Sequence, residues 1–245
     1  MKPIKLVAID MDGTLLNDEH QLTAKTLDVL KQTIAKGVMI VLATGRGIHN
    51  VRLVPEAIAL NQPVVAANGA DIYYQPTDSG EKSYLHAQSV KQLLSIIEEL
   101  SIPFWGFTDN GVFENRHLTD DEMARCLKIG VQTQDETLLQ QFYAQVKDLE
   151  NLEITQSAKT NYEINYEGIS KAAGIQKLCD YHDISMEEVM CLGDSLNDLK
   201  LFQVAGFPVA VANAIDELKE IAKAETLSNN EDGVAVAIER YVLQA

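Results

Sequence analysis

The sequence has few cysteines and no long apolar run. Its three cysteines are Cys126, Cys179 and Cys191. Their number is odd, and their spacing matches neither a CxxC pair nor a metal site. We therefore expect buried, reduced thiols in a cytoplasmic protein. No apolar segment of signal-peptide length precedes Asp10, and no run approaches the roughly 18 apolar residues of a membrane span. These absences predict a soluble protein that is neither exported nor inserted in a membrane.

Basic residues are also scarce. The 245 residues include 20 Lys and Arg against 36 Asp and Glu, which gives a formal net charge of −16. A protein of that charge repels the phosphate backbone of nucleic acid and anionic membranes, so neither is expected as a partner. If such a protein acts on an anionic substrate, its positive charge must be concentrated at the site, in a few basic residues or a bound metal ion.

The remaining composition, 46% hydrophobic with six prolines, is that of a globular protein, and its apolar residues fall in short unbroken runs. Residues 6–9 lead directly to Asp10 and Asp12, and residues 38–43 lead to Thr44. Such runs predict buried strands that end at polar residues. Two acids one residue apart repel each other unless a cation or a proton is shared between them. The alternative is that Asp10 only ends a strand and Asp12 only belongs to a turn.

Helical patterns separate these strands. Thr23 is expected to cap one helix, Gly37 to end it, and residues 47–60 to form another helix with an irregularity at Pro55. Strands that alternate with helices imply a parallel sheet that is covered on both faces. The predicted fold class is therefore α/β, with a doubly wound parallel-sheet core of the Rossmann type. In such sheets, ligands gather at the carboxyl ends of the strands.

The pattern changes near residue 75. Residues 75–82 are polar and contain Pro and Gly, and the strands beyond them mix polar with apolar residues, as in a sheet with one wetted face. With a helix that Ser89 is expected to cap, this stretch predicts an inserted α+β cap domain. The core pattern resumes after Gly168. We expect a core of residues 1–78 and 167–245 and a cap of residues 79–166.

Polar clusters stand beside the core strands or at helix starts. They are Asp10 with Asp12, Thr44, Lys171, and Asp194 with Asn197 and Asp198. Together they match phosphoryl transfer, which needs a carboxylate nucleophile, a metal ion that offsets its repulsion from the phosphate, and fixed donors to the phosphoryl oxygens. Asp10, Asp12 and Asp194 offer oxygen ligands of the kind that Mg²⁺ accepts. Thr44 can donate a hydrogen bond, and Lys171 supplies a positive charge.

These clusters resemble the four motifs of the haloacid dehalogenase (HAD) superfamily phosphatases, specifically the Cof-type branch, subfamily IIB. The matching segments are DMDGTLL, TGR, SKAAG and GDSLND. Their order and spacing fit over nearly the whole chain, and the segment AVANAIDELKEIAKAETLSNNEDGVAVAIE is also similar to that branch. One departure is Ala172, where family members commonly carry Gly. The resemblance implies a HAD-like core and a phosphatase that depends on Mg²⁺.

Carried over residue by residue, the resemblance also implies roles. Asp10 would be the nucleophile that forms an aspartyl-phosphate, and Asp12 would protonate the leaving alcohol and then activate water. Mg²⁺ would be held by the carboxylates of Asp10 and Asp194 and the main-chain carbonyl of Asp12. The implied phosphate-binding groups are the main chains of Met11 and Gly45 and the side chains of Thr44, Lys171 and Asn197. Asp198 would be a partner of the metal ion or of Lys171.

The expected substrates are small phosphomonoesters, most of all sugar phosphates, although Cof-type relatives also accept pyridoxal phosphate or flavin mononucleotide. A monomer or a weak homodimer is expected. A phosphomutase of the same fold is an alternative, because it would keep all four motifs and differ only in its product. A non-catalytic phosphate-binding regulator is another, against which the intact Asp10, Asp12, Lys171 and Asp194 argue.

Several residues near the motifs allow a structural interpretation. For Arg46 a structural ion pair is favoured over contact with substrate, and Asn68 with Gly69 is left open between a turn and a role at the site. Trp105 and Phe107 are expected to pack under the helices of the cap. The histidines lie outside every motif and are expected at the surface: His20, His49, His86, His117 and His182.

Overall fold

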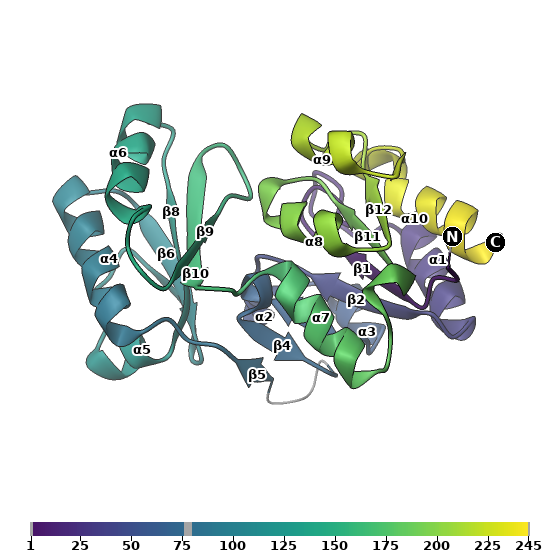
Figure 1. Cartoon of the computed structure of the whole chain (residues 1–245), viewed down its shortest axis with the longest axis horizontal. Coiled ribbons are helices and arrows are strands. Elements are labelled where there is room, and N and C mark those ends of the chain that lie inside the picture. The colour runs from purple at the N-terminus through teal and green to yellow at the C-terminus, as the bar shows by residue number, and fades with distance from the viewer. Residues whose placement is uncertain (1, 76–79, 245) are drawn as a thin grey trace.

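The computed structural model describes residues 2–75 and 80–244, and these form two lobes that lie side by side (Figure 1). The first lobe (residues 2–75, 80–83 and 169–244) is built on one sheet, and the second lobe (residues 84–168) on another. Among the helices of the described residues, none combines the length and the apolarity that a membrane crossing requires.

The first sheet has its strands in the order β13-β12-β11-β1-β2-β3-β4-β5. Their bounds are β1 (Leu6–Ile9), β2 (Met39–Ala43), β3 (Val64–Ala66), β4 (Asp71–Tyr73), β5 (Glu81–Lys82), β11 (Val189–Gly193), β12 (Phe207–Ala210) and β13 (Ala224–Glu225). The α-helices of this lobe are α1 (Ala24–Ala35), α2 (Ile48–Val51), α3 (Pro55–Ala59), α7 (Lys171–Tyr181), α8 (Leu199–Val204), α9 (Asp216–Ile221) and α10 (Gly233–Ile238). Further helical segments are the 3₁₀ turns η1 (Ala67–Gly69), η2 (Met186–Glu188), η3 (Leu196–Asp198) and η4 (Asn229–Glu231) and the π-helical segment η5 (Glu239–Leu243).

The central strand β1 pairs in parallel with β2 and β11. Successive side chains of a strand point to opposite faces of the sheet. Val7 and Ile9 therefore pack with α1 and α10 on one face, and Leu6 and Ala8 with α7 and α8 on the other. Burial on both faces is the reason why the strand is an unbroken apolar run. The predicted α/β fold with a doubly wound core is confirmed.

The second lobe is an antiparallel sheet with helices on one face. The strand order is β7-β6-β8-β10-β9. The strands are β6 (Phe104–Thr108), β7 (Gly111–Glu114), β8 (Cys126–Gln132), β9 (Leu152–Thr155) and β10 (Asn161–Tyr166). The helices are α4 (Ala87–Leu100), α5 (Asp120–Ala124) and α6 (Glu136–Val146). Helices α4 and α6 lie on the side away from the first lobe, so the other face of this sheet is turned toward that lobe (Figure 1).

The structure corrects several local expectations. The helix expected over 47–60 is two short helices, α2 and α3, because Pro55 begins a new helix, where its missing N–H costs nothing. Helix α4 begins earlier than expected: His86 occupies the N-cap position, and Ser89 is buried inside the helix. The edge strands β4 and β5 are antiparallel additions to the predicted parallel sheet.

Other expectations concern the domain boundary and single residues. The expected boundary at residues 78 and 79 lies outside the described residues, but β5, which follows it, still belongs to the first sheet. Gly168, where the core pattern was expected to resume, lies between β10 and α7. The five histidines are exposed, and the three cysteines are buried and free, as predicted.

Candidate active site

Three adjacent strands of the first sheet deliver polar residues to one edge. Asp10 follows β1, Thr44 follows β2, and Asp194 follows β11. Because β1 pairs in parallel with both of its neighbours, the carboxyl ends of these strands meet at the same edge. Lys171 is the first residue of α7, whose N-terminus is capped by the Ser170 hydroxyl. The sequence clusters are therefore brought together in space.

Lys171 is the cationic centre of this edge. Its side chain is fully buried, and its Nζ lies 2.6 Å from Asp10 Oδ1 and 2.7 Å from Asp198 Oδ1. Burial lowers the pKa of Lys171, but the two neighbouring carboxylates outweigh it and leave the pKa above its ordinary value. The ammonium group therefore stays charged beside Asp10. Asp198, expected beside either the metal ion or this lysine, contacts the lysine directly.

The carboxylates of Asp10, Asp194 and Asp198 form a tight acidic cluster. Each offers an oxygen atom, and these atoms lie within 4.8 Å of one another. Burial raises the pKa of Asp10 well above its usual range. Burial and the charge of Asp198 raise the pKa of Asp194 to about 6. A divalent cation would relieve this repulsion, and a set of carboxylate oxygens is the type of site that Mg²⁺ prefers.

Asp12 is held by Arg46. The guanidinium donates two hydrogen bonds to its carboxylate, Nε to Oδ2 at 2.7 Å and Nη2 to Oδ1 at 2.5 Å. Burial by itself raises the pKa of Asp12. The hydrogen bonds and the charge of Arg46 together outweigh this effect, so the pKa of Asp12 lies below its ordinary value. The ion pair favoured for Arg46 is present. Its partner is one of the two acids of the first motif.

The phosphate-binding groups implied by the resemblance lie on packed loops at this edge. Thr44 is buried, and its hydroxyl oxygen accepts a hydrogen bond from the Arg46 main-chain N–H at 3.1 Å. Met11 is also buried, and its carbonyl oxygen accepts a hydrogen bond from the main-chain N–H of Leu16 at 2.9 Å. Gly45 lies next to Thr44, where its carbonyl oxygen meets the second lobe.

Asn68 combines the two roles that its sequence left open. Its φ of 58° places it in a left-handed turn. Its side chain also reaches the site: Asn197 Nδ2 donates to its Oδ1 at 3.4 Å, and its own Nδ2 donates to Glu163 Oε2 at 2.7 Å. Gly69 has a positive φ of 103°, and a Cβ added there would lie 2.3 Å from the Ser170 carbonyl oxygen. This close approach packs the loop against the start of α7.

A cavity of about 390 Å³ lies between the two lobes. Its lining includes Asp10, Asp12 and Arg46 from the first lobe and Trp105, Phe107 and Glu163 from the second. The expectation that Trp105 and Phe107 pack under the helices is wrong. Phe104 of the same strand contacts the helix side, whereas Trp105 and Phe107 pack with Ala67 and Ala70 of the first lobe. The alternation of the strand produces this result, because both faces of the second sheet are covered.

Two further charged residues escaped the sequence analysis. Lys128 on β8 and Glu163 on β10 are buried, and Lys128 Nζ lies 2.6 Å from Glu163 Oε2. Each stands between apolar neighbours, in the segments CLKIGV and NYEINY. A single charge in the middle of an apolar strand was a detectable signal. The pairing of the two residues was not detectable, because they lie on separate strands 35 positions apart.

The family model of the haloacid dehalogenase-like hydrolases matches residues 7–125 and 113–238. The chain belongs to this family. As a haloacid dehalogenase-like hydrolase with phosphatase relatives, it is a phosphoric monoester hydrolase, and the predicted Cof-type resemblance is confirmed.

Relatives of this haloacid dehalogenase-like hydrolase match it along almost its whole length. It is 37% identical over 243 residues to the 5-amino-6-(5-phospho-D-ribitylamino)uracil phosphatase YcsE of Bacillus subtilis, covering 98% of this chain and 96% of that protein. It is 29% identical to the phosphatase YwpJ of the same organism, covering 95% of this chain and 98% of that protein. A solved haloacid dehalogenase-like hydrolase of B. subtilis has a TM-score of 0.88 at 25% identity, covering 96% of this chain and 99% of that one.

Proposed function

We propose that this enzyme hydrolyses small phosphomonoesters with Mg²⁺, through an aspartyl-phosphate on Asp10. The observation that carries the proposal is the convergence of Lys171, Asp194 and Asp198 on Asp10, which lines the cavity between the lobes. A buried lysine can stabilise the charge that develops on the transferring phosphoryl group, because fixed charges act strongly in a site from which water is excluded.

The reaction has two steps. An oxygen of Asp10 attacks the phosphorus atom while the bond to the alcohol breaks, and Asp12 gives the departing oxygen a proton. Water then attacks the same phosphorus atom, Asp12 takes a proton from it, and the bond to Asp10 breaks to release phosphate. Phosphoryl oxygens would be bound by the main-chain N–H groups of Met11 and Gly45 and the side chains of Thr44, Lys171 and Asn197.

A magnesium ion would be held by the carboxylates of Asp10 and Asp194 and the main-chain carbonyl of Asp12, with Asp198 close by. Such an ion offsets the repulsion between the nucleophile and the phosphate. The acidic cluster supports this assignment because its oxygen atoms are close and its carboxyl groups are under mutual repulsion. Asp198 also forms an ion pair with Lys171, so its carboxylate helps to hold the lysine ammonium group in place.

The pairing of Asp12 with Arg46 constrains the first step. While Arg46 holds both carboxylate oxygens, Asp12 stays ionised and has no proton to donate. Proton donation therefore requires this pair to loosen when substrate enters the cavity. Arg46 lines the same cavity as Asp10, so an incoming phosphate dianion can compete with Asp12 for the guanidinium.

For the substrate we propose a phosphorylated sugar or sugar alcohol. One specific observation favours a substrate that also carries a planar ring: Trp105 and Phe107 line the cavity on the second lobe. Aromatic side chains can stack on such a ring. The relative YcsE is named for a substrate that joins a phosphoribityl chain to a uracil ring. We infer a role of the second lobe in substrate selection, with the lobe bounded close to the expected residues 79–166.

A screen of phosphorylated metabolites tests this function. Free phosphate should appear with Mg²⁺, and chelation by EDTA should abolish its release. Release of phosphate into solution, without transfer to a second position on the substrate, separates a hydrolase from a phosphomutase. Asp10→Asn is the control for contaminating phosphatases. Full activity after exhaustive metal removal, or an active Asp10→Asn protein, contradicts the proposal.

A further inference from the structure

Lys128 and Glu163 form a buried pair in the second lobe, and each of them also makes a hydrogen bond to the first lobe. Lys128 Nζ donates to the Gly45 carbonyl oxygen at 2.7 Å. Glu163 Oε2 accepts from Asn68 Nδ2 at 2.7 Å. Both contacts cross between the lobes, and they connect residues 83 and 95 positions apart in sequence.

One contact ends on Gly45, an implied phosphate ligand. The other ends on Asn68, on the loop after β3, which accepts a hydrogen bond from Asn197, a second implied ligand. A third crossing supports the same loop, because Asn165 Nδ2 donates to the Ala67 carbonyl oxygen at 3.0 Å. The second lobe therefore touches both loops through buried polar groups.

The pair is almost entirely buried: the Lys128 side chain is 0% exposed and that of Glu163, where it borders the cavity, is 4% exposed. Lys128 Nζ lies 4.8 Å from the centre of the Trp105 ring and 5.7 Å from that of Phe107. The second oxygen of Glu163 accepts from Ser157 Oγ at 2.8 Å. A buried ion pair is a poor source of stability, because apolar side chains of the same volume are often as good or better. Stability therefore does not explain the pair, whereas its contacts to the first lobe can fix the position in which the two lobes meet.

We propose that Lys128 and Glu163 form a latch that couples closure of the two lobes to the placement of Gly45 and Asn197 for phosphate binding. When the lobes are closed, both charges are satisfied by loops of the first lobe. When they separate, Lys128 and Glu163 lose these partners, and Gly45 and Asn68 lose a fixed contact. Lys128 and Glu163 are positioning residues, since each acts on the phosphate through another residue. This inference rests on the proposed phosphatase function.

The test removes both charges together, so that neither is left buried alone. Lys128→Met with Glu163→Gln should raise KM for an aryl phosphate and the inhibition constant of inorganic phosphate by about tenfold or more, the equivalent of one lost charge-assisted hydrogen bond. A merely structural defect would reduce the amount of active enzyme. It would lower kcat and leave both constants unchanged, so these constants separate positioning from folding.

A matched control exists in the same molecule. Lys200 of α8 and Glu153 of β9 form another pair between the lobes, with Nζ and Oε1 2.6 Å apart, but the lysine is exposed. Lys200→Met with Glu153→Gln should change both constants less than about twofold, as expected for a surface pair. Asn68→Gly is a second probe from the first lobe. It keeps the left-handed backbone, removes the contact with Glu163, and should also raise both constants.

Two results would overturn the latch. One is a double variant of Lys128 and Glu163 whose constants stay within twofold of the wild type. The other is a control pair that raises them equally. Calorimetric titration of inorganic phosphate in the presence of Mg²⁺ measures the same affinity without turnover. A wild type that binds phosphate but hydrolyses no ester would therefore refute the hydrolase and leave the latch to be judged on its own result.

Discussion

At the scale of single residues, Lys171 is the group on which the proposed chemistry depends most. It is fully buried between Asp10 and Asp198. Lys171→Met should lower kcat by at least about 100-fold, the usual loss for one donor to a developing charge. Lys177→Met on the same helix removes an exposed lysine paired with Glu81 and is the control. If Lys171→Met retains its fold and turns over within a few-fold of the wild type, the lysine does not contact the phosphoryl group.

Asp194 gives a prediction about pH. Its pKa in the folded protein, about 6, lies above the ordinary value of 3.8. A folded-state pKa that is raised makes a contribution to stability that is complete below the ordinary pKa and is lost as pH rises through about 6. The melting temperature of the metal-free protein should therefore fall between pH 5 and pH 7, because Asp194 ionises in this range. Each kcal/mol lost corresponds to about 2–4 °C in a chain of this size.

The measurement is thermal unfolding in EDTA at both pH values, for the wild type and Asp194→Asn. The variant should show the smaller fall, because an amide cannot ionise. Asp10 also has a raised pKa, in part because of the charge of Asp194, so the difference between the two proteins reports the ionisation of Asp194 together with its repulsion of Asp10. Equal falls in the two proteins would mean that Asp194 is not under repulsion.

The site residues differ in how far the sequence could identify them. Asp10 and Thr44 follow apolar runs and Lys171 begins a helix, and all three lie in short motifs, so local sequence was enough. Lys128 and Glu163 could not be paired, because their contact depends on the register of β8 and β10. The side of the sheet on which Trp105 lies depends on the pairing of β6 with β8.

At the scale of elements, Gly69 joins the loop after β3 to the start of α7. A Cβ there would lie 2.3 Å from the Ser170 carbonyl oxygen, and φ is 103°. Gly69→Ala should destabilise the protein by about 1–3 kcal/mol or more and lower activity, because Ser170 precedes Lys171. Gly37 has a φ of 84° with open space around it. Gly37→Ala should cost only the conformational strain, about 1–2 kcal/mol, with normal activity.

Denaturant unfolding and kcat/KM measured on both variants check this prediction. If Gly37→Ala and Gly69→Ala behave alike in both measurements, the contact with Ser170 has no importance of its own.

Elements that depend on local chemistry were predictable, and those that depend on tertiary pairing were not. Helix α1 begins after Thr23 and ends near Gly37, as the cap residues indicate. The strands β4 and β5 have three and two residues. They exist because they pair with the edge of the sheet, and no periodicity can appear in so short a segment.

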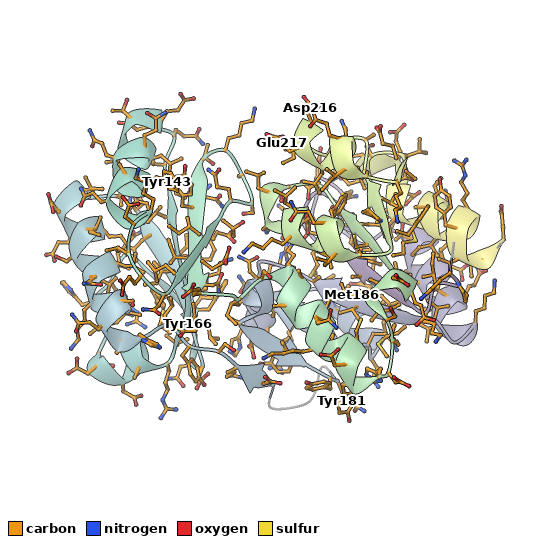
Figure 2. All side chains as sticks on the ribbon, viewed as in Figure 1. Tyr143, Tyr166, Tyr181, Met186, Asp216 and Glu217 are labelled. Atoms are coloured by element: carbon orange, nitrogen blue, oxygen red, sulfur yellow. The ribbon has the colours of Figure 1, made fainter. Side chains whose placement is uncertain are left out.

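At the scale of the whole molecule, net charge should govern the encounter with substrate. The protein carries −16, and Asp216 and Glu217 lie at the outer end of α9 (Figure 2). These two residues also line a cleft of about 620 Å³ together with Asp194. Repulsion of a phosphate dianion is screened by salt, so kcat/KM should rise between about 0.01 M and 0.15 M ionic strength, where the Debye length falls from roughly 30 to 8 Å.

Asp216→Asn with Glu217→Gln should raise kcat/KM at low salt and have little effect at high salt. The measurement is the salt dependence of the initial rate at low substrate concentration. A kcat/KM that falls steadily with salt would show instead that the local positive charge of the site dominates the encounter.

The central claim is that Asp10 becomes phosphorylated and that Asp12 is needed to release the phosphate. An aryl phosphate with a good leaving group needs little protonation, so Asp10 of the Asp12→Asn variant should still attack its phosphorus atom, whereas water activation should fail. Intact-protein mass spectrometry of Asp12→Asn after mixing with substrate and Mg²⁺ should show an added mass of about 80 daltons, one phosphoryl group. Asp10→Asn with Asp12→Asn should show none. A single variant that turns over at the wild-type rate with no covalent species would contradict the claim.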